Sequence, residues 1–175
     1  MKAGKRELEK YLDWALKNGA HDAVMVDPRT VVTAPWVRLK CQFGCYKYGL
    51  SHCCPPYTPT HEATRLLLDT YKVAILLHKH VGPDPFEGMK ETPVDLERVL
   101  FLDGYYKAWA MGHGGCKRCK KCNLPSPCAH PERARPSMEA CGIDVYATAR
   151  AVGLPLEVVR THSDERECYG LVLVE

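Results

Sequence analysis

The sequence predicts an α+β fold, a single mixed domain over residues 1–175 with two cysteine-rich loops. The chain has 175 residues, of which 46% are apolar and 26% charged, the size and composition of one ordinary folded domain. Helix-type and strand-type patterns both occur, and the chain contains no internal repeat. Most of the ten cysteines fall in two segments dense in Cys, Gly and Pro, residues 41–59 and 116–136.

The first elements are a helix and two strands. Residues 5–17 are expected to be helical, because leucines recur at helical spacing and Asn18-Gly19 ends the pattern. Strands are expected over residues 23–26 and 30–39, separated by the turn residues Asp27-Pro28. The first cysteine loop follows.

A helix, a strand and a second helix occupy the middle of the chain. Thr60 can cap a helix that runs to about Tyr71, and the apolar residues 73–79 predict a buried strand. Thr92-Pro93-Val94-Asp95 is a helix start, with a capping Thr, a Pro in the first turn and an acidic residue three positions after the cap. We expect that helix to reach about Met111-Gly112.

The remaining elements follow the second cysteine loop. Residues 137–152 are predicted to form a helix, which Gly153 and Pro155 end. Residues 156–160 and 169–174 are predicted to be two closing strands.

Charge and apolar patterning exclude two classes of protein. The net charge is +3, which is too weakly basic for a typical nucleic-acid-binding protein. The longest apolar run, residues 73–77, is far too short to cross a membrane, and residues 1–7 carry no apolar targeting segment. We therefore expect a cytoplasmic protein that binds neither nucleic acid nor a membrane.

The second loop carries the strongest chemical signal. Cysteines in a reducing compartment more often bind metal than form disulfides. Cys116, Cys119, Cys122 and Cys128 are separated by two, two and five residues. The first three thiolates can each reach a different iron of one [4Fe–4S] cluster, as in the bacterial ferredoxin run, whose last gap is three residues. Zinc is the alternative metal, although Cys119 and Cys122 leave little chain between two zinc knuckles.

The first loop supplies a second set of ligands, Cys41, Cys45 and Cys54. Adjacent cysteines rarely ligate one cluster together, so Cys53 is interpreted as a spare or alternate ligand, while the two prolines after Cys54 fix its direction. The candidates for a fourth ligand are Cys128, Cys141 and His52. Without one, an iron would be open to substrate. Cys168 has no partner at metal spacing and is expected to be structural.

Four blocks of the sequence carry a resemblance to a known family. They are Cys41-Gln42-Phe43-Gly44-Cys45, Cys54-Pro55-Pro56-Tyr57-Thr58-Pro59, Cys116 to Cys128 followed by His130-Pro131, and Arg135 to Val145. From about Lys40 to Gly153, the chain resembles a family of prokaryotic proteins described as predicted metal-binding proteins, a domain of unknown function. The resemblance implies metal binding through seven cysteines: Cys41, Cys45, Cys54, Cys116, Cys119, Cys122 and Cys128. Cys53 departs from the family pattern, and the family implies no particular activity.

The block from Arg135 to Val145 has two interpretations. It is either an anchoring helix whose N-terminus faces a cluster, or part of a substrate pocket in which Arg135 holds an anion.

These observations lead to three hypotheses of function. The first is one iron–sulfur-binding domain with two [4Fe–4S] clusters, which exchanges electrons with a redox partner protein. Basic residues between the ligands would favour cluster assembly and could dock an acidic partner: Lys117, Arg118, Lys120 and Lys121. The second is an enzyme with substrate at an open iron of the first loop, assisted by Arg135, Glu139 or a histidine. The third is a zinc-stabilised interaction module with no redox role.

Overall fold

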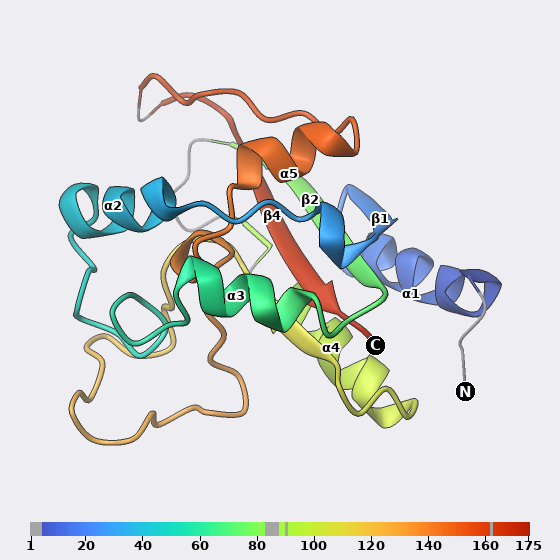
Figure 1. Cartoon of the computed structure of the whole chain (residues 1–175), viewed down its shortest axis with the longest axis horizontal. Helices are drawn as coiled ribbons and strands as arrows, with labels where there is room; N and C mark the ends of the chain where they lie inside the picture. The colour runs from blue at the N-terminus through green and yellow to red at the C-terminus, as the bar shows by residue number, and fades with distance from the viewer. Residues whose placement is uncertain (1–4, 83–87, 90, 162) are drawn as a thin grey trace.

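A four-stranded antiparallel sheet lies at the centre of the part of the chain that the computed structural model describes, residues 5–82, 88–89, 91–161 and 163–175 (Figure 1). Its strands lie in the order β1 (Asp22–Val26), β2 (Ala74–Val81), β4 (Arg166–Leu173) and β3 (Trp109–Met111). The two central strands are the longest and pair along their whole length. Together with the helices described next, this sheet confirms the predicted mixed α+β class.

Helices cover both faces of the sheet. On one face, α1 (Lys5–Lys17) and α4 (Thr92–Leu102) pack on a core that includes Ile75 and Leu77. On the other face, α3 (His61–Leu68) and α5 (Val145–Ala151) pack on a core that includes Leu76. Successive side chains of a strand point to opposite faces, so β2 supplies both cores, and its side chains at these positions are fully buried. Each such side chain contributes about 1.5–3 kcal/mol by leaving water.

Several elements agree with the prediction. The helix over residues 5–17 and the first strand are confirmed. The hydroxyl of Thr60 caps α3 by accepting the Ala63 N–H at 3.2 Å, although α3 ends before Tyr71. The buried strand predicted over residues 73–79 is β2.

The predicted strand over residues 30–39 is wrong. The chain forms the short 3-10 helix η1 (Pro28–Thr30) and then α2 (Pro35–Gly44). Pro35 favours this helix start, because a proline in the first turn has a suitable φ and lacks an N–H that would need a partner. Cys41 therefore lies on the last turn of a helix instead of in a loop.

The helix that begins at Thr92 is shorter than predicted. Gly104 turns the chain with a φ of 101°, in the left-handed region that favours glycine, and residues 109–111 form β3 instead of a last helical turn. The N-cap is Glu91, not Thr92. The Thr92 hydroxyl instead donates to the carbonyl of Asn18 at 2.7 Å, which ties α4 to the end of α1.

The predicted helix over residues 137–152 is divided in two. The 3-10 helix η2 (Glu139–Cys141) ends at Gly142, which has a φ of 77°. A side chain at Gly142 would meet the neighbouring helix, because a Cβ there would lie 2.7 Å from Cβ of His61. Helix α5 then starts after Asp144, whose carboxylate accepts the Ala147 N–H at 2.9 Å.

The last part of the chain also differs from the prediction. Residues 156–160, all of which the structure describes, form no strand. The final strand, β4, begins at Arg166 rather than at residue 169, because it extends to pair with the whole of β2.

Candidate metal centres

Two segments far apart in the sequence meet at one end of the molecule. Residues 45–60 and 112–136 run as turns and bends, and they lie near each other in Figure 1. The ring Nε2 of His52 lies 2.9 Å from the carbonyl oxygen of Ser126, which joins the two segments directly. The second segment closes on itself, since the Gly112 N–H donates to the carbonyl of Pro136 at 2.9 Å.

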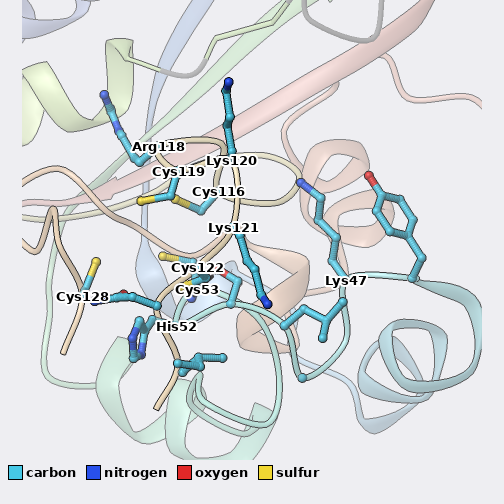
Figure 2. Close-up of a pocket in the computed structure, with 16 residues that line it drawn as sticks. Lys47, His52, Cys53, Cys116, Arg118, Cys119, Lys120, Lys121, Cys122 and Cys128 are labelled. Carbon is cyan, nitrogen blue, oxygen red and sulfur yellow. Dashed lines mark hydrogen bonds between the residues drawn. The ribbon is translucent and has the colours of Figure 1, made fainter. Parts of the chain in front are cut away.

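Five cysteines line one cavity of about 380 Å³ between these segments (Figure 2). They are Cys53 from the first segment and Cys116, Cys119, Cys122 and Cys128 from the second. The structure therefore brings together all four cysteines that the sequence assigns to the second site. It adds Cys53, which sequence reasoning treated as a spare.

Hydrogen bonds and nearby cations favour negative charge on one cysteine of this five-cysteine cavity, Cys116. A hydrogen bond from Cys53 lowers the pKa of Cys116, with the Arg118 N–H and the charges of Arg118 and Lys47 acting the same way and burial opposing them. The same hydrogen bond, together with burial, raises the pKa of Cys53. The His130 N–H also donates to Sγ of Cys128 at 3.4 Å. These contacts stabilise the thiolate of Cys116, the form in which cysteine ligates metal, whereas burial and the neighbouring thiols raise the pKa of Cys119.

Three cysteines line a second, smaller cavity of about 150 Å³. Cys41 comes from the last turn of α2, Cys45 directly follows that helix, and Cys54 comes from the turn in which its N–H donates to the Ser51 carbonyl at 3.0 Å. Burial raises the pKa of Cys41, and the neighbouring charges of Cys45 and Glu139 add to this effect. Burial likewise raises the pKa of Cys54. The charge of Arg38 opposes this effect at Cys41, and that of Lys47, which lines the same three-cysteine cavity, opposes it at Cys54.

One carboxylate shares the three-cysteine cavity. Glu139, the first residue of η2, lines it together with Ser137. Burial raises the pKa of Glu139, although hydrogen bonds from its own N–H and from the Ser137 hydroxyl act in the opposite direction. Its Oε2 is buried and has no hydrogen-bond partner among the described residues.

The adjacent residues Cys53 and Cys54 belong to different cavities. Both are buried, yet Cys53 lines the five-cysteine cavity and Cys54 the three-cysteine cavity. Consecutive side chains point apart, so a Cys-Cys pair at the boundary between two sites can serve each of them. That adjacent pair was the only sequence signal for this arrangement.

The other candidates for a fourth ligand lie elsewhere. Cys128 and His52 line the five-cysteine cavity, not the three-cysteine one. Cys141 is 2% exposed and packs in the apolar core, where burial raises its pKa to about 12. Cys168 is buried on β4 beside a larger cavity. None of these four residues lines the cavity of Cys41, Cys45 and Cys54.

The side chain of Arg135 is paired with a carboxylate of the protein. Its guanidinium donates to both carboxylate oxygens of Glu97, at 2.8 and 2.6 Å, and stacks over Trp109 with 4.5 Å between the guanidinium carbon and the ring centroid. Glu97 also accepts the N–H of Ala110 at 2.7 Å. The helical turn of this block, η2, starts at Glu139 and not at residue 137, while Arg135 lines a cavity of about 450 Å³ together with Arg118 and Arg133.

A cavity of about 750 Å³ adjoins the three-cysteine cavity. Cys41, Cys45 and Glu139 line both of them. Much of the larger wall is apolar, with Trp36, Val145, Leu156 and Tyr169 among the residues that form it. This size is within the range of small-molecule sites in proteins.

A buried histidine network borders the larger cavity. Nδ1 of His78 lies 2.7 Å from the carboxylate of Asp22, and its Nε2 lies 2.5 Å from Glu167, which lines the cavity. Glu167 also lies 2.8 Å from Nδ1 of His80, whose other nitrogen faces Glu165. Burial acts to raise the pKa of Glu167, but the hydrogen bonds to His78 and His80 lower it overall. The network therefore links the cavity wall to exposed groups that can exchange protons.

In the described ranges, no three or more His, Cys, Asp or Glu side chains are grouped closely enough to hold a single metal ion. No helix among those ranges is both long and apolar enough to cross a membrane.

Comparison with known proteins places the chain in a family. No curated protein and no solved structure gives a significant match. The family described as predicted metal-binding protein (DUF2284) matches residues 24–174, which include the whole sheet except the first two residues of β1, together with every cysteine. The chain therefore belongs to this family of predicted metal-binding proteins.

Proposed function

We propose that this protein binds two [4Fe–4S] clusters and uses them in electron transfer. One cluster would be held by Cys116, Cys119, Cys122 and Cys128, and the other by Cys41, Cys45 and Cys54. The observation that supports this most strongly is the sorting of eight cysteines into two cavities, with the boundary between Cys53 and Cys54. A pair of adjacent cysteines divided between two cavities suits two separate centres.

The donor set fits iron–sulfur clusters well. Thiolates are the ligands that [4Fe–4S] clusters take in proteins, four to a cluster. The five-cysteine cavity of about 380 Å³ is larger than a single tetrahedral zinc ion needs, because Zn–S bonds are only about 2.3 Å long. The space favours a cluster over zinc, whereas four thiolates suit either one.

Three features would support electron transfer. A bound cluster supplies one-electron redox chemistry. Cys53 and Cys54, which line one cavity each, are both buried. The exposed side chains of Lys117, Lys120 and Lys121 carry positive charge next to the second ligand set, which suits an acidic redox partner.

Anaerobically purified protein is expected to be brown, with iron and acid-labile sulfide in nearly equal amounts. The physical reason is that a [4Fe–4S] cluster contains one sulfide per iron. Iron, sulfide and zinc analysis together with electron paramagnetic resonance of the reduced protein tests this. Colourless protein with stoichiometric zinc, which fails to take up iron and sulfide on reconstitution, would overturn the proposal and favour the zinc-stabilised interaction module.

A second candidate function is an iron–sulfur enzyme. The observation in its favour is the cavity of about 750 Å³ that Cys41, Cys45 and Glu139 line. A substrate there would lie beside the first cluster and next to Glu167, which is hydrogen-bonded to His78. Binding of a small molecule to the reduced protein, seen as a saturable change in the resonance of one cluster, would distinguish this enzyme from a pure electron carrier.

A further inference from the structure

We infer that the carboxylate of Glu139 is the fourth protein ligand of the cluster at Cys41, Cys45 and Cys54. This inference rests on the proposed function and deepens it, since it assigns the ligand that the cysteines leave missing. Glu139 lines the same cavity as the three thiols. A cubane has four irons, so three thiolates leave one iron to another donor.

The chain holds Glu139 firmly against this cavity. The carbonyl of Ala140, the next residue, accepts hydrogen bonds from the guanidinium of Arg38 and the hydroxyl of Thr58, each at 2.6 Å. Arg38 lies three residues before Cys41 on α2, and Thr58 lies four residues after Cys54. One carbonyl therefore fixes η2 to both segments that carry the thiols.

The carboxylate itself lacks one partner. Oε2 of Glu139 is buried without a hydrogen bond among the described residues, although such an atom loses about 1–3 kcal/mol of solvation when it is left unsatisfied. The Ser137 hydroxyl and the Glu139 N–H are hydrogen-bonded to the carboxylate, which leaves Oε2 as the oxygen available to a metal. An iron at this position would provide the missing interaction.

The placement of Glu139 also suggests why an oxygen ligand is used here. Cys41, Cys45 and Glu139 line the larger cavity as well as the small one. Carboxylate oxygen is a harder donor than thiolate and suits the soft cluster irons less well. The iron bound by Glu139 would therefore be the one that exchanges its ligand most readily, on the side from which a small molecule can approach.

The test compares oxidative loss of iron from reconstituted variants. One-electron oxidation by ferricyanide converts a [4Fe–4S]²⁺ cluster into [3Fe–4S]⁺ and one Fe²⁺. The three-iron product has its own electron paramagnetic resonance signal, which measures the loss. We expect Glu139→Gln, which keeps the size and removes the charge, to lose this iron at least about tenfold faster than wild type. Glu139→Cys, which supplies a thiolate, is expected to lose it more slowly than wild type.

The matched control is Glu157→Gln. Glu157 is an exposed carboxylate that lines only the larger cavity, so its variant should behave like wild type. If Glu157→Gln loses iron as fast as Glu139→Gln, the faster loss is caused by the removal of negative charge near the cavity and not by the loss of a ligand. That result would overturn the inference. Should Glu139→Gln fail to fold, Glu139→Cys decides alone: slower loss supports ligation, and unchanged or faster loss contradicts it.

The outcomes separate this inference from the proposed function. Wild-type protein that takes up no iron and sulfide would overturn both. Wild-type protein with two clusters, together with a Glu139→Gln variant of the same iron content and the same rate of loss, would overturn the ligand assignment alone.

Discussion

Replacing Cys119 by alanine is expected to remove about half of the bound iron, and replacing Cys54 by alanine is expected to remove the other half. The reason is that the two residues line separate cavities and belong to separate sets of thiols. Iron and sulfide analysis of each variant, purified anaerobically, measures the loss. Resonance spectra of the reduced proteins should show that each variant keeps the cluster that the other one lacks.

Two further cysteines serve as controls for this pair. Cys168→Ser should keep the iron content of wild type, because Cys168 lines neither of the cysteine-rich cavities. Cys53→Ala should also retain the second cluster, since it leaves all four proposed ligands, Cys116, Cys119, Cys122 and Cys128, in place. Complete loss of iron from a folded Cys119→Ala or Cys54→Ala protein would mean that the clusters share ligands or assemble as one unit.

Replacing Arg135 by methionine is expected to lower the free energy of unfolding by about 3 kcal/mol without changing the iron content of the folded protein. Arg135 and Glu97 are paired through two hydrogen bonds, and both side chains are nearly buried, with 11% and 12% of their surface exposed. The substitution removes the Arg135 cation from a nearly buried carboxylate, that of Glu97. Anaerobic urea unfolding followed by circular dichroism measures the change.

A double variant tests the cause of that loss. Glu97→Gln removes the charge but keeps an amide oxygen that can accept the Ala110 N–H. Combined with Arg135→Met, it should recover at least about 1 kcal/mol of the stability that the single substitution loses. Additive losses would show that packing against Trp109, not the ion pair, is what Arg135 contributes. A fall in the iron content of the folded variant would instead show that Arg135 contributes to the cluster-binding site.

The sequence predicted elements well where local signals and burial agree. Helix α1 and strand β2 were found because their apolar patterns are long and their ends are marked. The strand over residues 30–39 was wrong because Val31 and Val32 suggested a strand, whereas Pro35 started a helix. The prediction that the helix continues beyond Leu102 was wrong because Gly104 turns the chain. Strand β3 then forms through its pairing with β4.

The sequence predicted which residues form the candidate site more readily than how those residues are placed around it. The spacing of Cys116, Cys119 and Cys122 is local, so the sequence alone groups these residues, and the structure places them on one cavity. The side that Cys53 faces depends on how two segments pack against each other, which spacing does not reveal. The position of Glu139 depends on the hydrogen bonds that Arg38 and Thr58 donate to the carbonyl of Ala140, and these residues are far apart in the sequence.

The boundary between Cys53 and Cys54 has a consequence for how charge would move through this protein. One peptide unit joins the two residues, and the thiol of Cys53 is hydrogen-bonded to Cys116. If both cavities hold clusters, this chain of bonds forms a short conducting route from one centre to the other. Two charged centres so near would also repel each other's added electrons. The first electron would then enter at a higher potential than the second, even if the two cubanes were chemically alike, and the protein would release its electrons one at a time.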